Sequence, residues 1–285
     1  QPGFDPKEYA DVLSLAFHNS SIPDSVERKK TKDPYQQVYR SPEMGLLNRW
    51  TLYLRDDNTG IINIRGTVNN TTSWMANFYA PMIPATGSLQ LNDSTVFNYQ
   101  LADNRQATVH AGWTIALGHL APGIISKIKE LFTGKGTHNF IISGHSQGGA
   151  IAFLLRSYLQ YEQIRGVIPA EIVMKTYCSA APKPGNLYYA YDYDFITRGG
   201  WGLTVVNASD WVPESPFSIQ RVSDFNEVNP FVNVKSILKK QKFLVRMAGN
   251  TVYSKLEKKP RKAQRKFEKY LGHKLFKLGI RKALP

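Results

Sequence analysis

A short glycine-rich stretch, GHSQGGA at 144–150, constrains the fold of this chain more than any other feature. The apolar run FIIS precedes it, and a helix-like run follows it to about residue 161. A strand that turns sharply into a helix with a serine at the tip is typical of a nucleophile elbow. Such a serine needs a strained backbone, and side chains at Gly144 or Gly148 would collide across the turn. The stretch therefore predicts that Ser146 presents its hydroxyl at the edge of a sheet.

Strand-like and helix-like segments alternate along the chain, which predicts an α/β fold with a mostly parallel central sheet and helices on both faces. The runs FIIS and LTVVN are continuously apolar, as strands buried on both faces should be. The first helix is expected to have Asp5 as N-cap, Pro6 at its first position and Glu8 as the third residue of a capping box. The expected strands are 50–55, 61–66, 138–143, 171–178 and 202–207, and later helices are expected at 110–132, 147–161 and 186–196.

Charge divides the chain into two parts. The net charge is +14, and residues 235–285 hold 17 of the 36 Lys and Arg but only two of the 22 Asp and Glu. We therefore expect a nearly balanced α/β core at 1–234 and a basic helical segment at 235–285. That segment either caps the core or adsorbs to an anionic membrane or lipid–water interface. Nucleic acid is not an expected partner, because stacking aromatic residues are sparse in the segment and no known motif is present.

Other features of the composition restrict the classes of protein and site. The single Cys178 excludes an internal disulfide and a zinc site built from cysteines. No apolar run approaches the roughly 18 residues of a membrane-spanning helix. A start at Gln1, without a signal peptide, is interpreted as a processed end, which favours a secreted or periplasmic protein.

A serine hydroxyl reacts only when a base removes its proton and donors hold the oxyanion, and in this fold the order along the chain is Ser, Asp, His. Asp210 follows the expected strand 202–207, from which a loop can direct it across the sheet edge. Asp224 is the alternative, although it follows no clear strand. No step of this chemistry requires a cofactor.

Four separated motifs carry a resemblance to a known family. They are INIRGTV at 62–68, with Ile64 in an aromatic place, VHAGW at 109–113, GHSQGGA with Gln147 in a leucine place, and CSAAPKPGN at 178–186 with Ser179-Ala180 where Phe-Gly is usual. In these motifs the chain resembles the fungal-type class 3 lipases, which are α/β-hydrolases. The resemblance implies a lipase-type serine ester hydrolase.

The resemblance also assigns roles to particular residues. It implies that Ser146 is the nucleophile and Asp210 the acid that orients the base. The backbone N–H groups of Thr67 and Gln147 would form the oxyanion hole. It further implies that His110 is structural.

In this family a lid lies between the oxyanion segment and the V-H-x-G-F motif. The corresponding interval here contains the apolar segment 71–87. The segment is therefore either a flap that opens onto lipid or a helix that is simply packed on the core.

The general base is the open question. His273 is the only histidine after Asp210, but on a helix it falls on the side opposite the apolar stripe of Phe267, Leu271 and Leu275, a solvated position. The alternative is a base in sequence beyond Pro285. The predicted function is a triacylglycerol lipase or a related enzyme, with a phospholipase A1 or a small-ester carboxylesterase as alternatives. A non-catalytic membrane-binding module with a hydrolase fold is the alternative from another class.

Overall fold

The computed structural model describes residues 1–21, 34–215 and the single residues 239, 254, 258 and 262. Six strands form the main sheet in the order β1-β2-β3-β8-β9-β10. The first three are antiparallel, whereas β3, β8, β9 and β10 run parallel to one another. The bounds are β1 Tyr35–Arg40, β2 Trp50–Arg55, β3 Gly60–Ile64, β8 Asn139–His145, β9 Val173–Ser179 and β10 Gly202–Val205. The hairpin and the parallel strands confirm the expected sheet, and β1 adds an edge strand that was not expected from the sequence pattern.

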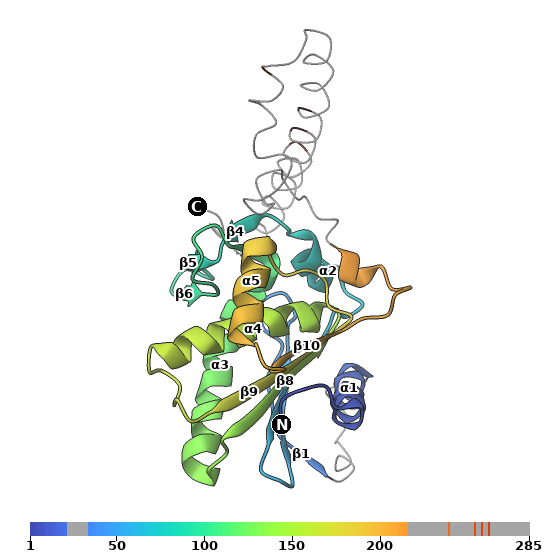
Figure 1. Cartoon of the computed structure of the whole chain (residues 1–285), viewed down its shortest axis with the longest axis vertical. Helices are drawn as coiled ribbons and strands as arrows, with labels where there is room; N and C mark the ends of the chain where they lie inside the picture. Colours follow the sequence, from blue (N-terminus) through green and yellow to red (C-terminus); the bar gives the residue numbers. More distant parts are fainter. Residues whose placement is uncertain (22–33, 216–238, 240–253, 255–257, 259–261, 263–285) are drawn as a thin grey trace.

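Helices cover both faces of this sheet (Figure 1). Helix α1 packs on one face, and α3 and α4 lie on the other with α5 beside α4. Alternate strand residues serve the two faces, because Ile61 and Ile141 pack in the α1 cluster while Ile62 and Ile142 pack in the larger one. The helices are α1 Pro6–Ser21, α3 Ala111–Lys135, α4 Gln147–Ile164 and α5 Leu187–Ile196.

Smaller elements surround the end of the sheet where the parallel strands terminate. Helix α2 follows β3, and two short ribbons, β4 with β7 and β5 with β6, come before α3. Their bounds are α2 Thr71–Phe78, β4 Met82–Pro84, β5 Thr86–Gln90, β6 Val96–Gln100 and β7 Thr108–His110, and a turn of 3-10 helix, η1, spans Val212–Glu214.

The start of α1 confirms one sequence prediction and corrects another. The Asp5 carboxylate accepts from the backbone N–H groups of Lys7 and Glu8 at 2.9 and 3.1 Å, as an N-cap does. The Glu8 carboxylate does not close a capping box. It accepts from Lys175 Nζ at 2.7 Å and from the Tyr177 hydroxyl at 2.9 Å. Burial alone would raise the pKa of Glu8, but these hydrogen bonds outweigh it and the pKa is lowered. Glu8 therefore ties α1 to the sheet by neutralising a buried lysine.

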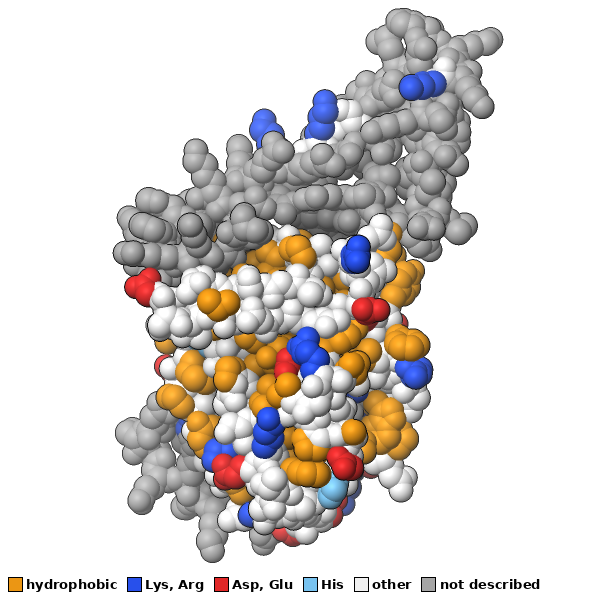
Figure 2. Space-filling model, turned by 90° about the vertical axis from the view of Figure 1, so that its left-hand side faces the viewer, with side chains coloured by type: hydrophobic (Ala, Val, Ile, Leu, Met, Phe, Trp, Pro, Cys, Tyr) orange, Lys and Arg blue, Asp and Glu red, His pale blue; other side chains and the backbone are white. Residues whose placement is uncertain are grey.

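The surface of the described core carries charges of both signs among hydrophobic side chains, as one face shows in Figure 2. Within the described ranges, no helix combines the length and the apolar character needed to span a bilayer. Residues 216–234 and nearly all of 235–285 lie outside the described residues. The division into a core and a basic helical segment stays a prediction.

Candidate active site

Ser146 lies between the end of β8 and the start of α4, in a backbone conformation that residues other than glycine rarely adopt. Its φ is 56° and its ψ is −125°. Its N–H donates to the carbonyl of Ser179 at the end of the neighbouring strand, at 2.9 Å. The side chain is half-buried. A strained residue held by surrounding structure points to function, and this geometry is that of the expected elbow.

The glycines around Ser146 remove side chains where backbones meet. A Cβ at Gly144 would overlap the carbonyl group of Gly148, which is the collision expected across the turn. A Cβ at Gly148 would instead overlap the carbonyl oxygen of Ile64. The second glycine is therefore required because α4 packs directly on the end of β3, which the sequence pattern did not indicate.

The segment that contains Thr67 runs alongside this elbow. Strands β3 and β8 pair in parallel with Ile64 opposite Gly144, so both chains leave the sheet at the same level. A Cβ at Gly66 would lie 2.8 Å from the carbonyl oxygen of His145 and 3.8 Å from the Cβ of Ser146. Thr67, the next residue, therefore follows a backbone that already touches the elbow.

Two backbone N–H groups at this point have no partner among the described residues. Gln147 is the first residue of α4, and the first N–H groups of a helix find no acceptor within it. Among the described residues, no acceptor bonds to the N–H of Gln147 or to that of Thr67. The positive end of the helix dipole adds to the attraction for negative charge there. Two such N–H donors can stabilise an oxygen atom on which negative charge develops.

Asp210 follows β10 at the same edge of the sheet. Its N–H donates to the carbonyl of Asn207 at 3.0 Å, and its carboxylate accepts from the N–H of Val212 at 3.0 Å. Burial lowers the pKa of His145, and the negative charge of Asp210 partly offsets this effect. The carboxylate is thus close enough to act electrostatically on the residue next to Ser146. The alternative acid Asp224 and the candidate base His273 both lie outside the described residues.

The described histidines nearest to the elbow pack in structural positions. His145 packs against Phe17 of α1 with the two rings tilted and their centroids 5.3 Å apart. His110 is fully buried and stacks on Trp113 at 3.7 Å. Its Nδ1 accepts from the N–H of Trp113, so Nε2 carries the proton and donates to the carbonyl of Asn77. Burial lowers the pKa of His110 to about 3, which keeps the ring neutral.

Asn77 and Asn48 are polar residues near the site that the sequence analysis did not select. The Gln147 side chain is 1% exposed, and its Nε2 donates to Asn77 Oδ1 at 2.8 Å and to the carbonyl of Ser73 at 3.1 Å. Its Oε1 accepts from Asn48 Nδ2 at 3.3 Å. In the sequence, only the polar Gln147 in a leucine place indicated a buried hydrogen-bond network here. Nothing in the sequence indicated the partners of Gln147.

The segment 71–87, expected to be either a flap or a packed helix, divides into α2, β4 and the start of β5. The outer face of α2 carries Trp74 and Phe78, which stack at 5.8 Å and are 43% and 49% exposed. The inner face is closely packed, with Ser73 and Ala76 fully buried. An apolar outer surface and a tightly held inner surface therefore belong to one short helix.

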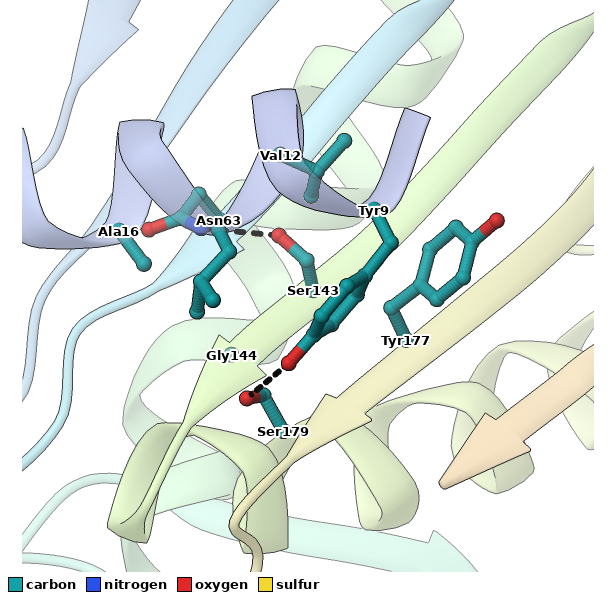
Figure 3. A pocket seen from close by; sticks show the side chains of 9 residues that line it. Tyr9, Val12, Ala16, Asn63, Ser143, Gly144, Tyr177 and Ser179 are labelled. Carbon is teal, nitrogen blue, oxygen red and sulfur yellow. Dashed lines mark hydrogen bonds between the residues drawn. The ribbon is translucent and has the colours of Figure 1, made fainter. Parts of the chain in front are cut away.

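A small cavity lies behind the elbow, between α1 and the sheet (Figure 3). The Tyr9 hydroxyl and Ser179 Oγ form a hydrogen bond of 2.7 Å across its wall. Asn63 Nδ2 donates to Ser143 Oγ at 2.8 Å. Because the carbonyl of Ser179 also accepts from Ser146, these contacts support the elbow from the side of α1.

Comparison with known proteins agrees with this geometry. The family model described as lipase (class 3) matches residues 61–220, which is more than half of the chain. The chain belongs to the class 3 lipase family. Its match includes all four motifs noted in the sequence, and the strand and the helix that flank the elbow.

Individual relatives are distant. A secreted mono- and diacylglycerol lipase 1 from Fusarium solani is 25% identical over 169 residues, which are 58% of this chain and 42% of that protein. The chain thus spans less than half the length of this relative. Two solved structures show the shared α/β-hydrolase fold. The Rhizomucor miehei triacylglyceride lipase has a TM-score of 0.54 at 16% identity, and a Penicillium expansum triacylglycerol lipase has 0.53 at 17%. Both matches cover 75% of this chain and 76% of the other.

Proposed function

We propose that this class 3 lipase family member hydrolyses carboxylic esters of lipids through an acyl-enzyme on Ser146. The observation that carries the proposal is the strained Ser146 with two N–H groups beside it, those of Thr67 and Gln147, for which the described part of the chain supplies no acceptor. A reactive hydroxyl and an oxyanion site at one point are what acyl transfer requires. The function of the Fusarium relative, an acylglycerol lipase by name, supports the same class of substrate.

In the proposed reaction Ser146 Oγ attacks the ester carbonyl while a histidine takes its proton. The negative charge that develops on the carbonyl oxygen is stabilised by the N–H groups of Thr67 and Gln147. The histidine then returns the proton to the leaving alcohol, which departs and leaves an acyl-enzyme. Water, activated by the same histidine, releases the acid and restores Ser146. Asp210 orients the histidine and stabilises its charged form.

The histidine itself is His273 or a residue in sequence beyond Pro285. A His273→Ala variant separates these alternatives when hydrolysis of a short soluble ester is measured. Loss of hydrolysis in the variant would assign the base to His273, and unchanged hydrolysis would exclude it.

The substrate is proposed to be an ester lipid at a lipid–water interface. The stacked Trp74 and Phe78 on the outer face of α2 give apolar contact surface near the elbow. We also propose that the protein is secreted, which the name of the Fusarium relative supports. The charge pattern predicts that the basic segment 235–285 binds anionic lipid, and this role stays a prediction.

Labelling with a fluorophosphonate tests the proposed chemistry directly. We expect one covalent adduct, located on Ser146 by peptide mass spectrometry and absent from Ser146→Ala. Labelling of Asp210→Asn should be at least about 100-fold slower, because the histidine loses its orienting partner. Ser157→Ala, which removes a buried serine hydroxyl on α4, is the control and should be labelled at the wild-type rate.

The outcomes separate the classes of function. Absence of any adduct would contradict the proposal and favour a non-catalytic module with a hydrolase fold. An adduct on another serine would overturn the assignment of Ser146. If Ser146 is labelled, the rates at which the unlabelled protein hydrolyses triacylglycerol, diacylglycerol, phospholipid and a short ester then rank lipase, phospholipase and esterase activity.

A further inference from the structure

Two departures of this chain from the family motifs meet at one side chain. Gln147 stands in a leucine place, and Trp113 stands in the aromatic place of VHAGW. Both bring a side-chain N–H donor. Gln147 Nε2 and Trp113 Nε1 donate to the same atom, Asn77 Oδ1, at 2.8 and 3.1 Å. The contact joins three segments that are 34 or more residues apart in sequence.

The other end of the Asn77 amide faces Thr67. Asn77 Nδ2 donates to Thr67 Oγ1 at 2.9 Å. The amide orientation is fixed, since Oδ1 faces two donors and Nδ2 faces an oxygen. The Asn77 side chain is therefore hydrogen-bonded to both residues whose N–H groups are proposed to hold the oxyanion. Its third hydrogen bond is the one from Trp113.

We propose that Asn77 is a positioning residue that sets the two oxyanion donors, Thr67 and Gln147, relative to each other. The inference rests on the proposed function, because it assigns a role within that site. Donors must be held close to the productive geometry to be effective, and the N–H of Gln147 belongs to the same residue whose side chain Asn77 holds.

In this proposal helix α2, which carries Asn77, stays packed against α3 beside the site. The carbonyl of Asn77 accepts from His110 Nε2 at 3.1 Å, and Gly112 N donates to the carbonyl of Tyr79 at 2.9 Å. A Cβ at Gly112 would overlap the carbonyl oxygen of Ala76, so α2 lies directly on the start of α3. Movement of α2 away from α3 would break these contacts and separate the two donors.

The test compares Asn77→Leu with Asn77→Asp. The leucine removes all three side-chain bonds at similar volume. The aspartate keeps them, because its oxygens accept from Gln147 and Trp113 and the Thr67 hydroxyl can turn to donate. We expect Asn77→Leu to lower kcat about 10- to 100-fold with KM changed less than about threefold. Asn77→Asp should keep kcat within about threefold of the wild type.

The family-like variants provide a second measurement. Gln147→Leu and Trp113→Phe each remove one donor to Asn77, and each should lower kcat about 3- to 10-fold. Because Gln147 acts through Asn77, the double variant Asn77→Leu/Gln147→Leu should lose no more than about threefold beyond Asn77→Leu alone. Multiplicative losses would contradict the proposal.

Asn186→Leu is the matched control. Asn186 also makes three side-chain hydrogen bonds, with Thr108, Gln106 and Tyr189, on the α5 side of the core. Its loss should reduce stability without changing kcat. An equal fall of kcat in the Asn77→Leu and Asn186→Leu proteins would mean that both changes act through general stability, and the positioning role would be wrong.

Amide NMR judges the positioning without relying on catalysis. The backbone N–H resonances of Thr67 and Gln147 should both shift in Asn77→Leu. Neither resonance should shift in Asn186→Leu. If these resonances do not move, the inference fails even when Ser146 is labelled by a fluorophosphonate. If they move but Ser146 is never labelled, the proposed function fails and the structural coupling stands.

Discussion

Ser146→Gly is expected to abolish ester hydrolysis and at the same time to stabilise the fold. The φ of 56° and ψ of −125° at this position suit glycine, and a residue with a Cβ held there costs about 1–3 kcal/mol. The extra freedom of glycine in the unfolded chain offsets roughly 0.5–1 kcal/mol. We therefore expect the free energy of unfolding to rise by about 1 kcal/mol, and kcat/KM to fall by about 10⁴-fold or more, because the proposed nucleophile is removed.

Two variants isolate these effects. Ser146→Ala removes the hydroxyl but keeps the Cβ, so it should lose hydrolysis without gaining stability. Ala180, which stands where the family usually has glycine, also has a positive φ, 44°. Ala180→Gly should therefore gain stability and keep hydrolysis. Denaturant unfolding and an ester assay decide the matter, and a Ser146→Gly protein less stable than Ser146→Ala would show that the elbow is not strained.

The fold could be predicted from sequence where patterns are local. The apolar run that became β8 and the glycines around Ser146 each report their own surroundings, and the structure confirms the parallel strands and the elbow. The expectation that LTVVN is a strand buried on both faces is wrong, because β10 lies at the edge of the described sheet and its residues are half-buried or exposed. Strand β1 was missed because YQQVYR carries polar residues on an exposed edge. Glu8 was assigned to its own helix because the sequence does not reveal a buried Lys175 on a strand 167 residues away.

The candidate site shows the same division. Ser146 and the Thr67 segment follow from local motifs that the sheet register brings together. Asn77 could not be found in this way. Its partners Thr67, Trp113 and Gln147 lie 10, 36 and 70 residues away along the chain. A hydrogen bond between such distant segments depends on the packing of α2 on α3, which no periodic pattern encodes.

The same packing makes stability depend on pH through His110. Burial lowers its pKa in the folded protein to about 3, from 6.5 in an unfolded chain. Above pH 6.5 the ring is neutral in both states and contributes no pH dependence. Below pH 6.5 the unfolded chain binds a proton that the folded protein excludes, so the free energy of unfolding falls by up to about 1.4 kcal/mol for each pH unit until about pH 3. Protonation of the ring adds a hydrogen to Nδ1, so acidification should break the bond that Nδ1 accepts from the N–H of Trp113.

His110→Asn separates this effect from other titrations. The asparagine can still cap α3 at the N–H of Trp113, but it does not titrate. The variant should be less stable than the wild type at pH 8, and the difference should narrow by up to about 3 kcal/mol between pH 6.5 and pH 4. Thr114→Val, which removes a buried bond to the carbonyl of His110, should show a difference that is constant with pH. Parallel stability curves for His110→Asn and the wild type would mean that folding does not lower the pKa of His110.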